Sequence, residues 1–315
     1  MCPVWVHRFA VVTAGATLIL IFVGALVTST GSGLAVPDWP LSFGQFFPPM
    51  VGGVLYEHGH RLVAAFVGIL TVTLMVCVTG WEPRSWVRWL ARAAVFAVVL
   101  QGTLGGLTVL LRLPTVISVS HACLAQAFLG MLVALAVCTA PGWAAPAQLS
   151  SFPERSALPR MAAVTVALVY GQLILGALMR HLGAGLAIPD FPLAFGRLIP
   201  PFDSPAVVIH FLHRVGALVV TLWVGWTVAR VCRQHWHDPW LRRPALLLAG
   251  LVLVQVTLGA GTIWTQRAVV IITAHVAVGA AVLATGVVLT LRAARLATLA
   301  ARASGHNFFS AQVTA

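Results

Sequence analysis

The chain has 315 residues, of which 60% are hydrophobic and 8% charged, and its mean hydropathy is +0.97. Soluble domains carry roughly 25% charged residues, so this composition excludes an ordinary soluble protein and indicates a chain solvated by lipid. The net charge of +12 comes entirely from arginines at the ends of apolar segments, which favours orientation in a bilayer over nucleic-acid binding.

Eight segments are long and apolar enough to cross a bilayer, which takes roughly 20 mostly apolar residues. In chain order they span 8–28, 55–80, 89–111, 117–140, 159–179, 207–230, 243–264 and 270–291. The first is long for a signal peptide and lacks an obvious cleavage site, and its GALV (24–27) recurs as GALM (176–179) in the fifth. We therefore expect all eight to be retained as transmembrane helices.

The arginines predict the orientation of these segments. Thirteen of the 19 lie on one side of the membrane, in the N-terminus, the loop 84–92, the linker 155–160, the loop 230–243 and the C-terminal tail. The positive-inside rule makes this side, with both termini, cytoplasmic. The long connections 29–54 and 180–206 then lie outside, and since they contain none of the five cysteines, no external disulfide is expected.

The chain is an internal duplication. GSGLAVPDWPLSFGQFFPP (31–49) aligns without gaps on GAGLAIPDFPLAFGRLIPP (183–201), with 12 of 19 positions identical. Further matches, such as QGTLGG (101–106) with QVTLGA (255–260), keep the offset between 152 and 154 residues. Four segments per half give both copies the same orientation, so a pseudo-twofold axis along the membrane normal should relate them.

These patterns predict an all-α integral membrane protein with eight transmembrane helices in two duplicated four-helix bundles. The connection between the halves is rich in Pro, Ala and Ser, as is typical of a tether. We expect an N-terminal bundle at 1–140, a cytoplasmic linker at 141–158, a C-terminal bundle at 159–292 and a cytoplasmic tail at 293–315.

Two histidines in each half lie at matching depths. His60 and His121 follow the outer ends of the second and fourth segments, and His213 and His275 occupy the equivalent places in the sixth and eighth. One isolated intramembrane histidine is most simply a hydrogen bonder between helices. Two duplicated pairs instead favour a planar haem held between each pair, since zinc would need a third or fourth ligand.

Charged residues accompany the first histidine of each pair. Glu57, His60 and Arg61 are spaced i, i+3, i+4 and share one helix face. Arg61 and its counterpart Arg214 could each neutralise a haem propionate, or could extend toward the lipid headgroups. Glu57 aligns with His210, so the halves differ here. Glu57 could transfer protons from a partly desolvated position, or could be an ordinary charged residue of a first helical turn.

For the other polar residues of these segments and connections we expect structural roles. His58 and His210 lie near the helix mouths, where a solvated histidine needs no further role. The outer connections share a PD(W/F)PL turn, with Asp38–Trp39 in one and Asp190–Phe191 in the other. Its prolines make it rigid, so it should either form a lid on a ligand edge or cap each bundle. Gln101 and Gln255 fall within apolar segments and should hydrogen-bond between helices.

At these residues the chain resembles the heme A synthase family, membrane enzymes of bacteria and mitochondria. The resemblance rests on EHGHR (57–61), the later HR (213–214), His121 and His275, the eight segments and the duplication, and it covers nearly everything from the first segment to the eighth. Some members carry a cysteine pair in an outer loop. This chain lacks that pair, which argues against a thiol-based redox role.

The resemblance implies conversion of haem O to haem A for aa3-type cytochrome oxidases, by oxidation of a ring methyl to a formyl group through a hydroxymethyl stage. The N-terminal half would take haem O between His60 and His121. The C-terminal half would hold haem b on His213 and His275. Glu57 would be the residue required for oxidation.

The resemblance also implies a setting, the bacterial cell (inner) membrane. Expected partners are membrane lipid, the enzyme that makes haem O and cytochrome oxidase assembly factors, and a homo-oligomer is compatible with it.

If both His60 and His121 bind the substrate iron, oxygen cannot coordinate there unless one leaves. Otherwise the methyl must be oxidised by loss of electrons and protons followed by water addition, with Glu57 as base.

Two other classes of protein stay open. A di-haem electron-transfer subunit would use the same four histidines without chemistry on the porphyrin. A transporter built from parallel repeats would spread its polar groups along a path through the membrane. Here those groups cluster at the outer ends of the segments, which argues against a transporter.

Overall fold

The computed structural model describes residues 2–143 and 156–313, with side chains described as far as Arg302. Eight long helices make up most of it: α1 (Val4–Ser29), α2 (Gly53–Trp81), α3 (Ser85–Leu110), α4 (Thr115–Thr139), α5 (Leu158–His181), α6 (Pro205–Gln234), α7 (Pro239–Trp264) and α8 (Val269–Val313). Short 3-10 turns, η1 (Pro141–Trp143) and η3 (Ala184–Leu186), follow α4 and α5. In the described part of the chain, β structure is limited to two isolated bridges within the long connections.

All eight helices are long and apolar enough to cross a membrane, so the predicted all-α membrane fold is confirmed. The helices begin and end within a few residues of the predicted segments, except that α8 continues without a break to Val313. The predicted boundary between the eighth segment and the tail is therefore not a break in the helix. The reason is local: residues 292–304 are rich in Ala, Leu and Arg and contain neither Gly nor Pro, so helix propensity carries the helix onward. Most of the predicted linker, 144–155, lies outside the described residues.

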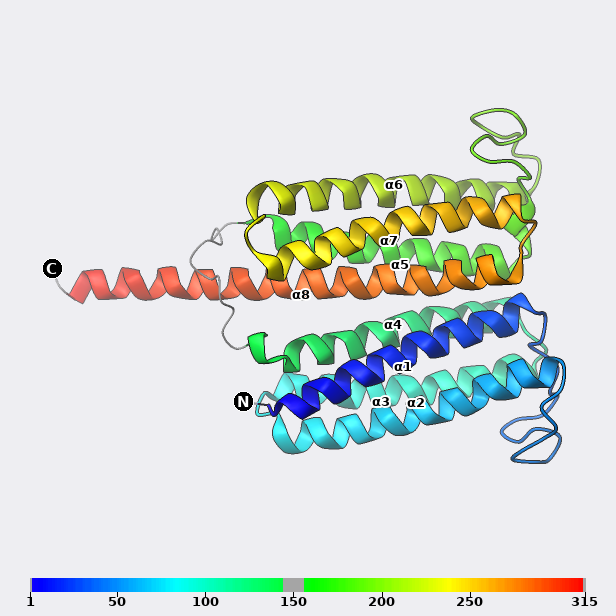
Figure 1. The fold of residues 1–315 in the computed structure, drawn as a ribbon, viewed down its shortest axis with the longest axis horizontal. Helices are drawn as coiled ribbons and strands as arrows, with labels where there is room; N and C mark the ends of the chain where they lie inside the picture. The colour runs from blue at the N-terminus through cyan, green and yellow to red at the C-terminus, as the bar shows by residue number, and fades with distance from the viewer. Residues whose placement is uncertain (1, 144–155, 314–315) are drawn as a thin grey trace.

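Each half of the chain forms a four-helix group, and the two groups lie side by side (Figure 1). In the N-terminal group α1 and α3 each pack against both α2 and α4. In the C-terminal group α5 and α7 pack in the same way against α6 and α8. The helices α2 and α4 therefore occupy opposite corners of their group, as do α6 and α8. The histidines predicted to form pairs come from these opposite corners.

The two groups meet through α1 with α8, α4 with α5, and α4 with α8. A twofold axis that exchanges the halves would exchange α1 with α5 and α4 with α8. The contact of α1 with α8 then becomes that of α5 with α4, and the contact of α4 with α8 is unchanged, so these contacts are compatible with the predicted pseudo-twofold. Near the end that carries the long connections, the interface is polar. Arg180 donates to the carbonyl of Ala25 (3.0 Å) and to Oγ of Ser29 (2.8 Å), and the Thr273 hydroxyl donates to the same Oγ (2.9 Å).

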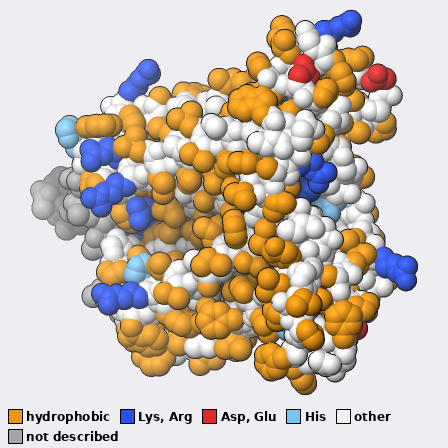
Figure 2. Space-filling view, turned by 45° about the vertical axis from the view of Figure 1, so that its right-hand side comes forward, with side chains coloured by type: hydrophobic (Ala, Val, Ile, Leu, Met, Phe, Trp, Pro, Cys, Tyr) orange, Lys and Arg blue, Asp and Glu red, His pale blue; other side chains and the backbone are white. Residues whose placement is uncertain are grey.

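The two long connections lie at the same end of the molecule, opposite the N-terminus (Figure 1). On the face seen in Figure 2, the acidic side chains lie at this end and several arginines gather at the other. Each connection contains a turn closed by an aspartate. Asp190 accepts the backbone N–H groups of Phe195 (2.7 Å) and Gly196 (2.8 Å), and Asp38 accepts the equivalent pair.

We predict that Asp190→Asn loosens this turn at neutral pH, because an amide oxygen cannot replace two carboxylate oxygens that each accept an N–H. The measurement is the rate at which trypsin cuts after Arg197, which directly follows the turn and pairs with Ala194; we expect it to rise several-fold. Asp203→Asn is the matched control, since Asp203 lies in the same connection and makes no hydrogen bond to another described side chain or backbone group. Equal cleavage rates in both variants would contradict the role of Asp190.

Acid should have the same effect on the wild-type turn. The N–H groups of Gly196 and Phe195 lower the pKa of Asp190 below its ordinary value of 3.8. A lowered pKa means that the turn is stabilised above pH 3.8 and loses this contribution as the pH falls through the lowered value. Hydrogen exchange at Phe195 and Gly196, corrected for the intrinsic pH dependence, should therefore stay constant from pH 7 to about pH 4 and accelerate below it.

Candidate functional site

The four predicted histidines occupy equivalent positions in four helices. His60 lies on α2, His121 on α4, His213 on α6 and His275 on α8. Each is six to eight residues beyond the first residue of its helix, or roughly 10 Å along the helix axis from the loop end. The predicted matching of depths is therefore seen in the fold.

Each imidazole lies against a glycine of a neighbouring helix. A Cβ atom on any of these glycines would crowd Cε1 of the ring: 2.9 Å for Gly24 and His60, 3.0 Å for Gly176 and His213, and 3.2 Å for both Gly105 with His121 and Gly259 with His275. The glycines come from α1, α3, α5 and α7, which are the other corners of each group. Histidines thus lie at one diagonal of each group and the glycines that contact them at the other.

The ring nitrogens of the N-terminal pair lack protein partners. Nδ1 of His60 and Nδ1 of His121 are both buried, and neither has a hydrogen-bond partner among the described residues. An unpaired polar group away from water costs free energy, so each of these Nδ1 atoms destabilises the group unless it finds a partner that the described residues do not supply.

The C-terminal pair is held by glutamine amides. Nε2 of Gln172 on α5 lies 3.0 Å from Nδ1 of His213 and donates to the His213 carbonyl at 2.7 Å. Nε2 of Gln255 lies 3.3 Å from Nε2 of His275, so the interhelical hydrogen bond predicted for Gln255 is present, while Nδ1 of His275 is buried without a partner among the described residues. Gln101 also bonds between helices, but to the carbonyl of His121 (2.9 Å) and not to its ring. Sequence reasoning missed Gln172; the available signal was a glutamine inside the apolar segment 159–179.

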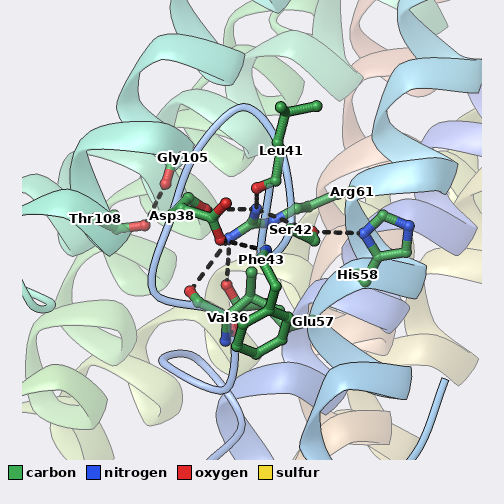
Figure 3. Close-up of polar contacts among 10 residues, drawn as sticks. All are labelled: Val36, Asp38, Leu41, Ser42, Phe43, Glu57, His58, Arg61, Gly105 and Thr108. Carbon is green, nitrogen blue, oxygen red and sulfur yellow. Dashed lines mark hydrogen bonds and ion pairs between the residues drawn. The ribbon is translucent and has the colours of Figure 1, made fainter. Parts of the chain in front are cut away.

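Glu57 and Arg61 form an ion pair beneath the first long connection (Figure 3). Oε1 of Glu57 lies 2.6 Å from the Arg61 guanidinium, and Oε2 accepts the backbone N–H of Val36 at 2.9 Å. The guanidinium also donates to the carbonyls of Asp38 (2.8 Å) and Leu41 (2.9 Å). Both side chains thus anchor the connection to α2. Glu57 is 4% exposed, which excludes the expectation of an ordinary solvated charge in a first helical turn.

The same anchor is built differently in the C-terminal half. His210, at the position equivalent to Glu57, accepts the backbone N–H of Ile188 (3.2 Å), which is the residue equivalent to Val36. Arg214 donates to the carbonyls of Ile188 and Asp190. Nε of Arg214 is buried without a partner among the described residues, so this arginine keeps a donor for an anionic group.

The expectation that His58 and His210 are solvated was wrong. Both are buried, at 6% and 3% exposure. His58 Nδ1 pairs with Oγ of Ser42 at 2.8 Å, whereas the corresponding residues of the C-terminal half, Phe211 and Ala194, pack as apolar neighbours. The long connections fold over the ends of the helices and bury these histidines. The position of a histidine along an apolar segment does not predict this burial.

The aromatic residues of the connections pack on helix ends. The Trp39 ring lies where a Cβ on Gly106 would fall within 2.6 Å of it. Phe191 meets Trp264 edge-on with ring centroids 6.0 Å apart and lies under Arg214, 5.6 Å from the ring centroid. These contacts favour the bundle-capping alternative for the PD(W/F)PL turn. Asp38 and Asp190 close the turns and do not face the histidines.

The donor set suits a haem better than a small metal ion. Within the described residues, no group of three or more His, Cys, Asp or Glu side chains could hold a metal, which excludes a zinc-type site there. Two imidazoles from opposite corners of a four-helix group are the donors that a haem takes at its two axial positions. The two imidazoles of each pair, each beside a glycine of a neighbouring helix, fit this group.

Comparisons with known proteins show the family of the chain. Residues 52–287 match the model of the COX15-CtaA family, described as cytochrome oxidase assembly protein. The heme A synthase of Symbiobacterium thermophilum is 36% identical over 260 residues, covering 77% of this chain and 80% of that protein. The heme A synthase of Shouchella clausii is 31% identical over 233 residues (68% and 72%), and that of Geobacillus kaustophilus 30% over 276 residues (85% and 84%).

The family match covers more than half of the chain and spans all four histidines and Glu57. With eight membrane-spanning helices in the same chain, the protein is a multi-pass membrane protein. It belongs to the COX15-CtaA family of cytochrome oxidase assembly proteins, the family of the heme A synthases.

Proposed function

We propose that this protein is a heme A synthase, a membrane oxidoreductase that converts haem O to haem A by oxidising a ring methyl to a formyl group. The observation that carries the proposal is the duplicated arrangement of two imidazoles at opposite corners of each four-helix group, each against a glycine. Relatives at 30–36% identity over most of the chain are named heme A synthase.

The two halves have different roles in this proposal. Haem O is the substrate of the N-terminal group (1–140), between His60 and His121. A haem b bound by His213 and His275 in the C-terminal group (159–292) supplies electron transfer. Both arginines donate to carbonyls of their own connection, but the charge of Arg61 is paired with the Glu57 carboxylate, whereas no ion pair of Arg214 occurs among the described residues and its buried Nε has no partner there. Arg214 is therefore the better propionate candidate.

Glu57 is the group that we propose to take a proton during oxidation. Conversion of a methyl to a hydroxymethyl group with water removes two electrons and two protons, and the step to formyl removes two more of each. Each carboxylate oxygen of Glu57 accepts one hydrogen bond, from Arg61 or from the Val36 N–H, and keeps a second lone pair that can take a proton.

The setting follows from the arginine distribution and the family. We propose that the chain lies in the bacterial cell membrane with both termini in the cytoplasm and the long connections outside. The enzyme that makes haem O would supply the substrate, and assembly factors of cytochrome oxidase would receive the product. The di-haem electron-transfer subunit is the competing function, because it would use the same four histidines.

Expression in a host that makes haem O, followed by extraction and mass analysis of the pigments, separates the two functions. We expect hydroxymethyl and formyl derivatives of haem O, together with haem b. Unchanged haem O beside stoichiometric haem b would contradict the synthase and favour the electron-transfer subunit. His60→Ala should abolish the oxidised pigments and retain haem b, whereas His213→Ala should remove haem b.

Glu57→Gln tests proton transfer separately from loop anchoring. The amide keeps the size of the side chain and an oxygen that can accept a hydrogen bond from Arg61 or from the Val36 N–H, but it cannot act as a base. We expect near-normal haem content and loss of methyl oxidation by about 10²-fold or more, typical for removal of a general base. Wild-type turnover in this variant would show that Glu57 only anchors the connection.

Gly24→Ala tests the contact between glycine and imidazole. Its Cβ would lie 2.9 Å from Cε1 of His60, so the ring must shift away. An off-rotamer side chain costs about 1 kcal/mol, or roughly fivefold in porphyrin occupancy of the N-terminal group. Gly15→Ala on the same helix is the control, since nothing lies within 4 Å of its Cβ position. Equal occupancy in the two variants, measured by pigment extraction, would contradict the packing argument.

A further inference from the structure

The two halves hold the first histidine of each pair in different ways. In the C-terminal half, the Gln172 amide reaches from α5 to both Nδ1 and the backbone carbonyl of His213. In the N-terminal half, the equivalent residue of α1 is Leu20, which has no group that can hydrogen-bond. Nδ1 of His60 is accordingly buried with no partner among the described residues.

The Gln172 contact is built into the packing between helices. A Cβ on Gly216 of α6 would overlap Oε1 of Gln172, so the amide occupies space that this glycine leaves open. The N-terminal residue equivalent to Gly216 is Val63. The pair Gln172 and Gly216 in one half therefore replaces the pair Leu20 and Val63 in the other. The halves thus differ at both residues of this contact, and random substitution at one position would not account for both differences.

Gln172 is suited to hold an iron ligand. It contacts Nδ1, which leaves Nε2 of His213 available for iron. When Nε2 binds a metal, Nδ1 carries the ring hydrogen and needs an acceptor. An amide has both a donor and an acceptor, so a turn of Gln172 that brings Oε1 to Nδ1 lets it accept that hydrogen and gives up the bond from Nε2 to the His213 carbonyl. The same side chain can thus contact the ring before and after coordination.

We propose, resting on the proposed function, that Gln172 is the positioning residue that makes the C-terminal porphyrin a permanent cofactor, and that the absence of such a partner at His60 makes the N-terminal porphyrin exchangeable. A substrate site must admit haem O and release haem A in every cycle, whereas an electron-transfer site must keep its haem. Hydrogen bonds to metal-bound imidazoles raise ligand basicity and strengthen binding. The two halves differ in this bond.

The test uses the purified holoprotein and two readouts on the C-terminal haem, its rate of transfer to apomyoglobin and its midpoint potential. Gln172→Met keeps the length and approximate volume of the side chain but removes the hydrogen bond, and Gln172→Leu installs the residue of the other half. We expect both variants to lose this haem about 10- to 100-fold faster, the usual effect of removing such a partner. The potential should rise, because a less basic ligand stabilises ferric iron less.

Gln101→Leu is the matched control, since Gln101 is a glutamine between helices that bonds only the carbonyl of His121. It should leave the potential and transfer rate of the C-terminal haem unchanged. The reciprocal variant, Leu20→Gln with Val63→Gly, should slow porphyrin transfer from the N-terminal half by about tenfold or more. The added glycine provides the space that the amide needs.

The outcomes separate this inference from the proposed function. If His213→Ala leaves the haem spectrum unchanged, His213 is not a ligand and the proposed function fails. If His213→Ala removes the haem while Gln172→Met keeps its wild-type transfer rate and potential, the proposed function stands and the role of Gln172 is overturned. A faster transfer with no change of potential would show that Gln172 contributes packing alone, which also overturns it.

Discussion

A polar ring inside hydrocarbon needs a partner, and this requirement organises the protein. The helices supply lipid-facing apolar surface almost everywhere, yet they bring four imidazoles to one depth near the same end. In the N-terminal group the buried Nδ1 atoms of His60 and His121 have no partner among the described residues. We propose that the other ring nitrogen of each histidine holds a haem within its helix group. The glycines beside the rings and the diagonal placement of the histidines support this proposal.

The two duplicated halves share one arrangement of helices and connections, and a few contacts distinguish them. Both halves close their long connection with an aspartate turn and anchor it with an arginine one residue after a histidine. The N-terminal anchor is a buried Glu57–Arg61 ion pair, and the C-terminal anchor is neutral His210 with Arg214. The ring of His213 has an amide partner and that of His60 has none. In our proposal these differences assign chemistry and porphyrin exchange to the N-terminal half and haem retention to the C-terminal half.

The sequence predicts the helices, the duplication and the histidine depths, because each depends on local hydropathy or on repetition along the chain. It could not predict the burial of His58 and His210, which depends on how the connections fold back over the helix mouths. Nor could it reveal that Glu57 and His210 perform the same anchoring task, since a carboxylate and an imidazole share no pattern. The contact of Gln172 could not be predicted for a related reason: its partner, His213, lies on another helix, 41 residues away. In α8 the local sequence determines the outcome: helix propensity extends the helix past the end of its apolar part.

Electron paramagnetic resonance of the oxidised protein with both groups loaded tests the central claim most directly. Two imidazoles on each iron make ferric haem six-coordinate and low-spin, so the account predicts two low-spin signals, one for each half. Loss of His121 should abolish one of them and loss of His275 the other. High-spin, five-coordinate iron in both halves, or low-spin signals that survive replacement of all four histidines, would contradict the account.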